Sequence, residues 1–198
     1  MYAAGRGVER DDVQAVHWFR LSAQQIKATV LSSRKTQLFL GWSYETGCGV
    51  KQDATMAARW YRLSADQGDS RAQCELGRMH KNGSGAEQND TEAVRWYKLS
   101  AGQGDPPAQC DLGWMYETGR GVERDCAEAV RWYQLSAQQG NDHAQYNLGL
   151  AYEFGRGVTQ DLSQAQYWYQ KSADQNHADA IGQLTLLLKE KLAVRQGG

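Results

Sequence analysis

A 36-residue period runs through this chain and limits what it can fold into more than any other feature. Glycines mark the period at Gly41, Gly77, Gly113 and Gly149. Tryptophans keep the same interval at Trp60, Trp96, Trp132 and Trp168. A fixed period of about 20–50 residues is typical of stacked arrays, in which each unit packs mainly on its neighbours. Such arrays usually present a surface that holds a partner, and the sequence alone does not name that partner.

Composition narrows the classes of function. The chain has 198 residues, of which 41% are hydrophobic and 23% charged, and its mean hydropathy is −0.70. The net charge of −1 provides no basic field to attract a phosphate backbone. No apolar run approaches the roughly 18 residues that a membrane span needs. We therefore expect neither nucleic-acid binding nor membrane insertion.

The unit "PPAQCDLGWMYETGRGVERDCAEAVRWYQLSAQQGN" shows how one repeat is built. Its first half predicts a helix, because apolar side chains recur at helical spacing, at Ala108, Leu112, Met115 and Tyr116. Gly113 lies inside this helix, where a glycine costs about 1 kcal/mol relative to alanine. A glycine at this position in four units therefore predicts that a neighbouring helix approaches closely there.

The second half of the unit predicts another helix after a sharp turn. The segment "TGRGV" ends the first helix, since two glycines separated by one residue permit a positive φ at both. Asp125 is then expected to be the N-cap. Residues of capping type stand at the equivalent positions, Asp11, Asp53, Asn89 and Asp161. The second helix carries Trp132 and Tyr133 and ends near Gly140, so each repeat is predicted to be an antiparallel helix pair.

The whole pattern, A-x-x-x-L-G-x-x-Y-x-x-G-x-G-V-x-x-D-x-x-x-A-x-x-W-Y-x-x-S/A-A-x-x-G, resembles the Sel-one-like repeat family of tetratricopeptide-type α-solenoids. The resemblance covers almost the whole chain, and it implies an all-α, right-handed superhelix of about five helix pairs. Members of this family act as scaffolds, adaptors and binders. We predict a single domain over 1–198, with a partial repeat at 1–28, an irregular junction at 26–37, repeats at 36–70, 71–106, 107–142 and 143–177, and a capping helix at 178–192.

Two departures from the pattern stand out. The first unit starts within a repeat, because "YAAGRGVERD" from Tyr2 aligns with "YETGRGVERD" from Tyr116. An incomplete first unit would expose apolar side chains near Val13, and self-association there is an expectation. In the third unit, His80 and Ala86 stand where other units have tyrosine and valine.

The first helices predict a binding surface. By analogy with tetratricopeptide arrays, the residue after the helix glycine faces a concave groove, and aromatic residues stand there in two units. An exposed aromatic stripe with a polar rim is typical of a binding hot spot. The alternative is that these tryptophans pack sideways onto the next unit. The predicted groove comprises Leu38, Trp42, Arg78, Cys110, Trp114, Glu117, Tyr146, Leu150 and Glu153.

No constellation of residues predicts catalysis, a cofactor or a metal site. The four histidines form neither an H-x-x-x-H motif nor a Cys/His cluster of the zinc type. His80 replaces a core tyrosine, so a structural role is expected for it. Ser32 and Lys35 form the S-x-x-K spacing of penicillin-recognising enzymes, but the companion motifs S-D-N and K-T-G are absent.

The four cysteines are expected to be free. Cys74 and Cys110 occupy equivalent places in successive units, and stacked helices lie roughly 8–10 Å apart. A disulfide needs Cα atoms within about 7 Å of each other. Free thiols favour a reducing compartment, so a cytoplasmic location is expected.

These observations together predict a non-catalytic protein-interaction scaffold that binds a peptide or protein segment in the groove, without a cofactor. Two alternatives stay open. One is a β-lactam-binding or hydrolase-like activity, as in cysteine-rich relatives, although the periodic cysteine pairs of those relatives are absent. The other is a degenerate, truncated paralogue without a partner of its own.

Overall fold

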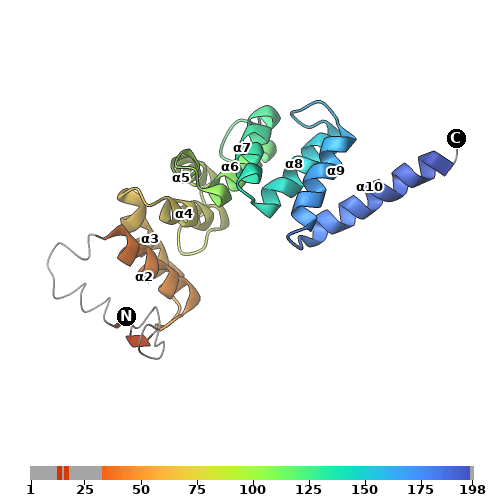
Figure 1. The fold of residues 1–198 in the computed structure, drawn as a ribbon. Helices are drawn as coiled ribbons and strands as arrows, with labels where there is room; N and C mark the ends of the chain where they lie inside the picture. Colours follow the sequence, from red (N-terminus) through yellow and green to blue (C-terminus); the bar gives the residue numbers. More distant parts are fainter. Residues whose placement is uncertain (1–12, 15, 18–32, 197–198) are drawn as a thin grey trace. The chain divides into compact units, whose positions relative to one another are not determined.

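The computed structural model describes residues 13, 14, 16, 17 and 33–196, and all regular structure within them is helical (Figure 1). The all-α repeat fold is therefore confirmed. Most of the partial first repeat and most of the predicted junction fall outside the described residues. The complete helices are α2 (Arg34–Thr46), α3 (Ala54–Asp66), α4 (Ser70–Asn82), α5 (Asp90–Gly102), α6 (Pro106–Thr118), α7 (Cys126–Gln138), α8 (Asp142–Phe154), α9 (Leu162–Ala173) and α10 (Ala178–Gln196).

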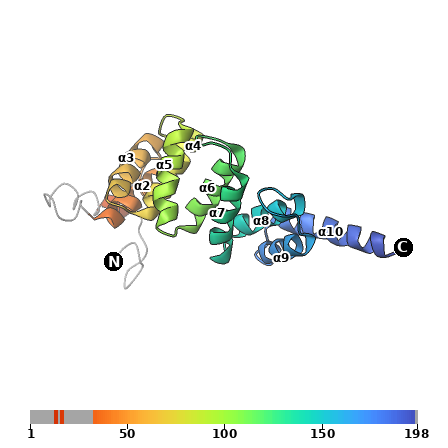
Figure 2. The same ribbon diagram turned by 90° about the horizontal axis from the view of Figure 1, so that it is seen from above.

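The chain divides into two compact units, Met1–Gln103 and Gly104–Gly198. In the first unit, α2 packs on α3, α3 on α4, and α4 on α5 (Figure 2). In the second unit, the pairs α6–α7 and α8–α9 form the repeats, and α10 packs on α9. Each unit is thus a short solenoid of helix pairs, joined in sequence in the order that the 36-residue period predicts.

Capping side chains fix where the helices begin. Asp53, Asn89, Asp125 and Asp161 cap the second helices as predicted, because each side chain accepts a hydrogen bond from a backbone N–H in the first turn. The first helices have caps of their own, which the sequence analysis did not assign. These caps are Asp69, Asp105 and Asn141.

Glycines fix where the first helices end. Gly119 and Gly121 in "TGRGV" have φ values of 72° and 66°, a left-handed conformation that other residues rarely adopt. The turn predicted from two glycines separated by one residue is therefore confirmed. It folds the chain back so that the second helix lies against the first.

Two polar ladders join the helices of each pair. A fully buried serine on each second helix donates to a backbone carbonyl at the start of the first helix, as Ser136 does to Pro106 at 2.7 Å. A glutamine just after the second helix donates to a buried glutamine on the first, as Gln139 does to Gln109 at 2.8 Å. The same two bonds recur in all four described pairs, and each joins residues that are 30 positions apart in the sequence. These bonds satisfy polar groups that would otherwise be costly to bury.

The core is centred on tyrosines rather than on the tryptophans that the period highlights. Of the four periodic tryptophans, Trp96 is buried, whereas Trp60, Trp132 and Trp168 are only half-buried. The tyrosine that follows each of them is fully buried, at Tyr61, Tyr97, Tyr133 and Tyr169. One residue along a helix is about 100° of rotation, and this turns the tyrosine toward the first helix of its own pair.

Candidate functional site

The predicted groove residues of the first unit lie on α2 and α4. Trp42 is 39% exposed, and its ring lies 5.9 Å from that of Phe39, between centroids. Leu38 is half-buried and packs against the core of this unit. Arg78, also half-buried, forms ion pairs with Glu45 on α2 and with Glu75 on its own helix. Among the predicted groove residues of this unit, Trp42 is therefore the one whose apolar side chain is exposed.

The predicted groove residues of the second unit lie on α6 and α8 and are all half-buried. Cys110 and Trp114 pack at the edge of one core cluster, and Tyr146 and Leu150 at the edge of the next. The guanidinium of Arg120 lies 5.1 Å from the centre of the Trp114 ring. These side chains thus combine a core contact with a solvent-facing edge.

The glutamates of the predicted groove, and the equivalent Glu45 of α2, have partners within the fold. Glu117 accepts a hydrogen bond from the Tyr133 hydroxyl at 2.8 Å and pairs with Arg156 at 2.9 Å. Glu45 has the same two kinds of partner, Tyr61 and Arg78, and Glu153 accepts from Tyr169. The negative charge of Glu45 and Glu117 is therefore compensated within the fold, which leaves less of it for a basic partner.

The surroundings of the buried tyrosine hydroxyls raise their pKa values. Burial raises the pKa of Tyr133 well above its ordinary value, and the negative charge of Glu117 raises it further. The same causes raise the pKa of Tyr61 and of Tyr169, where Glu45 and Glu153 are the carboxylates. Each hydroxyl is therefore held in its neutral, hydrogen-donating form.

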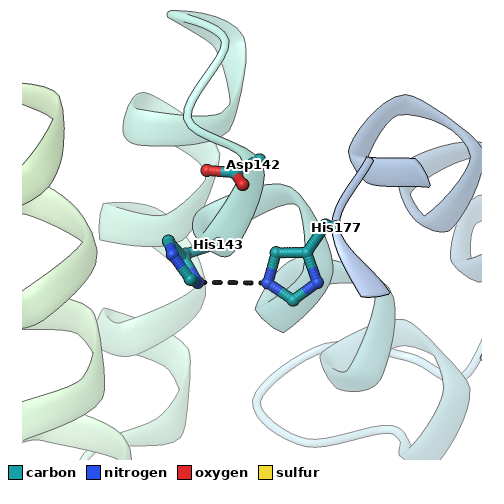
Figure 3. Close-up of side chains that lie close together, drawn as sticks. All are labelled: Asp142, His143 and His177. Carbon is teal, nitrogen blue, oxygen red and sulfur yellow. Dashed lines mark hydrogen bonds between the residues drawn. The ribbon is translucent and has the colours of Figure 1, made fainter. Parts of the chain in front are cut away.

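A cluster of potential metal ligands lies where α8 and α10 begin (Figure 3). Asp142 and His143 open α8, His177 precedes α10, and one ligand atom from each lies within 4.8 Å of the other two. Nε2 of His177 is 3.1 Å from Nδ1 of His143. The ring of Tyr146 stacks on that of His177, with centroids 5.0 Å apart. The sequence analysis missed this cluster because the two histidines are 34 residues apart and match no local motif.

His177 acts as a helix cap in this cluster. Its Nδ1 accepts a hydrogen bond from the backbone N–H of Ala180 at 3.3 Å. Asn141, Asp105 and Asp69 make the same bond one, two and three repeats earlier. The alignment of His177 with these residues is the signal that could have identified it from sequence.

The cap determines the chemistry available to the histidine pair. Nδ1 of His177 accepts the hydrogen bond from Ala180, so in the neutral ring the proton is on Nε2. The Nε2–H group then donates a hydrogen bond to Nδ1 of His143. A metal ion on Nε2 would need the other tautomer, whose Nδ1–H would face the N–H of Ala180. We therefore assign the pair to anchoring α10 rather than to binding a metal.

The remaining candidate features offer little chemistry. His80 is half-buried, and its Nδ1 lies 3.0 Å from the carbonyl oxygen of Glu87. Lys35 is on α2, whereas Ser32 lies outside the described residues. All four cysteines are free, as predicted. Among the described residues, no helix is both long and apolar enough to cross a bilayer.

Comparisons with known proteins agree with this architecture. The protective antigen c5321 of uropathogenic Escherichia coli strains, which displays an SLR fold, is 36% identical over 97% of this chain with a TM-score of 0.84. This chain spans only 40% of the length of that antigen. A Sel1 repeat protein from Oxalobacter formigenes is 35% identical to this chain, with a TM-score of 0.77. The match covers 87% of this chain and 69% of that protein.

More distant structures share the fold alone. An immunity protein from Pseudomonas aeruginosa, PA5088, is 23% identical over 90% of this chain and 71% of its own, with a TM-score of 0.53. No curated protein gives a significant match. The Sel1 repeat pattern itself matches residues 1–26, 35–69, 70–105, 106–141 and 142–177. With most of its length in these five segments, the chain belongs to the Sel1 repeat family.

Proposed function

We propose that this chain is a non-catalytic adaptor that binds a peptide or protein segment on its first helices. Proteins with Sel1 repeats generally serve as protein-interaction scaffolds, and two solved relatives with more than 30% identity carry the same repeats. The observation that supports the proposal most directly is the exposure of Trp42, whose side chain is 39% exposed on the first helix α2. Tryptophan is among the residues most enriched in binding hot spots.

Each unit contributes its own surface to this proposal. In the first unit, Trp42 is the anchor, with Leu38 and Arg78 beside it. In the second unit, the anchors are the outer edges of Trp114, Tyr146 and Leu150, with Cys110, Glu117 and Glu153 completing the surface. Because Glu117 is already paired with Arg156, apolar contact is expected to provide most of the affinity there. Free thiols are consistent with a reducing, cytoplasmic setting for this function.

The test is capture of partners from cell extract by the immobilised native chain and by two variants. Trp42→Ala removes the proposed anchor, and Leu135→Ala removes a leucine of comparable exposure, 47%, on a second helix. Truncation of an aromatic anchor commonly costs about 2 kcal/mol, roughly a 30-fold loss of affinity. We expect Trp42→Ala alone to lose the captured proteins while its melting temperature stays close to native. Equal capture by all three proteins would refute the assignment of Trp42.

A further inference from the structure

A pocket of about 510 Å³ opens in the first unit between α3, α4 and the loop that follows α4. Ala58, Leu76 and Ala86 form apolar walls, and His80 also lines the space. Arg59 and Arg62 on α3 stand at its rim. This pocket is not part of the surface proposed above, because it is built on a second helix.

The pocket exists because this part of the array carries smaller side chains than the equivalent part of the second unit. Ala58, His80 and Ala86 occupy the repeat positions that Val130, Tyr152 and Val158 occupy there. Those three larger residues belong to one hydrophobic cluster that fills the corresponding space. Valine and tyrosine also recur at these positions elsewhere in the chain, at Val94, Tyr44, Tyr116, Val50 and Val122. Removing methyl groups and a phenol ring from a packed layer leaves a void when the backbone does not collapse.

The charge at the rim also differs from that of the other repeats. Arg95 and Arg131, at the repeat position of Arg59, pair with Glu92 and Glu128 at 3.1 and 3.0 Å. In place of that glutamate, α3 has Met56, whose sulfur lies 4.0 Å from Nη1 of Arg59.

The second rim arginine contacts an aromatic ring. Arg62 lies over the Trp96 ring, 5.0 Å from its centre. Within the described part of the chain, neither Arg59 nor Arg62 forms an ion pair with a carboxylate. Two uncompensated positive charges therefore border an apolar pocket.

We infer that this pocket binds an acidic peptide segment of a partner protein, with an apolar side chain in the pocket and a neighbouring carboxylate on Arg59 and Arg62. Arginine suits carboxylates because its planar fork can donate two parallel hydrogen bonds. The pocket is open along α3, where Thr55, Arg59, Arg62 and Leu63 are all exposed. A free small ligand is usually 70–90% buried in its site, whereas a peptide needs only one side chain buried and is held by its flanks. An open, charged-rim pocket therefore suits a peptide better.

The repeats themselves supply the test variants. Ala58→Val with Ala86→Val fills the pocket with the residues that neighbouring repeats carry. Met56→Glu gives Arg59 the intrahelical partner that Arg95 and Arg131 have. Leu135→Ala, which removes an exposed leucine at the repeat position of Leu63, is the matched control in the second unit. Thermal melts establish whether each variant folds. If the double variant Ala58→Val with Ala86→Val, called the filled variant, does not fold, Met56→Glu still tests the inference.

The probe is a random heptapeptide display library selected on the full native chain. We expect enrichment of peptides that place leucine, isoleucine, methionine or phenylalanine next to aspartate or glutamate. Individual peptides should bind the filled variant at least tenfold more weakly and Met56→Glu about fivefold more weakly, with Leu135→Ala unchanged.

Three outcomes would overturn the inference. One is that no peptide is enriched, or that the enriched peptides lack acidic residues. Another is that they bind the filled variant and Met56→Glu as well as the native chain. The third is that N-acetyl-leucine binds with micromolar affinity in a titration while the library yields nothing, which would assign the pocket to a free small carboxylate.

Discussion

Gly113 on α6 lies directly against the ring of Tyr133 on α7: a Cβ added at Gly113 would be 2.7 Å from the ring and 3.1 Å from the carbonyl oxygen of Ala129. Real Cβ atoms do not approach that closely, so the glycine is what allows the two helices to pack. The predicted close approach is therefore confirmed. Gly41, Gly77 and Gly149 meet Tyr61, Tyr97 and Tyr169 in the same way.

Gly113→Ala should therefore destabilise the fold even though alanine is the better helix former. Overpacking costs about 1–3 kcal/mol, and the gain in helix propensity is about 1 kcal/mol, so we expect a net loss of up to about 2 kcal/mol. Gly182→Ala is the matched control, because a Cβ at Gly182 in α10 would meet nothing within 4 Å. Urea unfolding followed by circular dichroism should show opposite signs for the two variants. Stabilisation by both would mean that the tyrosine ring moves aside without cost.

The tyrosine–glutamate pairs predict a dependence of stability on alkaline pH. Burial raises the pKa of Tyr61, Tyr133 and Tyr169, with each glutamate adding to the rise. The unfolded chain releases these protons near pH 10, before the folded chain does. The stability that the neutral hydroxyls contribute is thus fully present below about pH 10 and is lost as the pH rises above it.

The measurement compares melting temperatures between pH 8 and 11.5 for the native chain and a variant with phenylalanine at all three positions. The variant should start lower, because three hydrogen bonds are lost at about 1 kcal/mol each. Above about pH 10, the melting temperature of the native chain should fall more steeply with pH than that of the variant. Lysines titrate alike in both proteins, so the difference in slope reports the tyrosines. Parallel curves would show that the tyrosines do not titrate with unfolding.

His177 should be replaceable by the residue that other repeats use as a cap. His177→Ala removes the acceptor for the Ala180 N–H and should cost about 1 kcal/mol, whereas His177→Asp should restore most of it. Amide hydrogen exchange in the first turn of α10 reports this directly. His143→Ala separates the alternatives, because it removes the histidine pair and keeps the cap. If His143→Ala and His177→Asp both increase exchange as much as His177→Ala, the pair and not the cap holds α10.

Much of this fold could be predicted from sequence because it follows from local rules repeated at a fixed interval. Asp125 caps a helix and Gly119 ends one for reasons contained within a few residues. The role of Gly113 could also be inferred, because an interior helical glycine that recurs needs a packing reason. The deeper burial of Tyr133 compared with Trp132 could not, since the pattern shows both residues at every repeat and does not show which one faces the first helix.

The candidate sites depend on contacts between residues far apart in the chain. Glu117 is predicted from sequence as a residue of the groove, and its partners Tyr133 and Arg156 lie 16 and 39 residues away in the chain. His80 and Ala86 were visible as departures from the repeat, yet their consequence required knowing that Ala58 lines the same space. A repeat alignment shows which residue differs, and only the packed structure shows which differences coincide.

Because Ala58, His80 and Ala86 line the same space, filling that space should change the stability of the fold. Ala86→Val adds two methyl groups to an apolar space that Val158 fills in the second unit, and burying each contributes about 0.8 kcal/mol at most. We expect the melting temperature to rise by a few degrees, while Ala86→Ser, which adds no apolar volume, leaves it unchanged or lower. A fall for Ala86→Val would mean that the neighbouring side chains already close the space. A more stable variant that no longer binds the selected peptides would show that the native chain keeps this pocket open at the expense of stability, as binding sites commonly do.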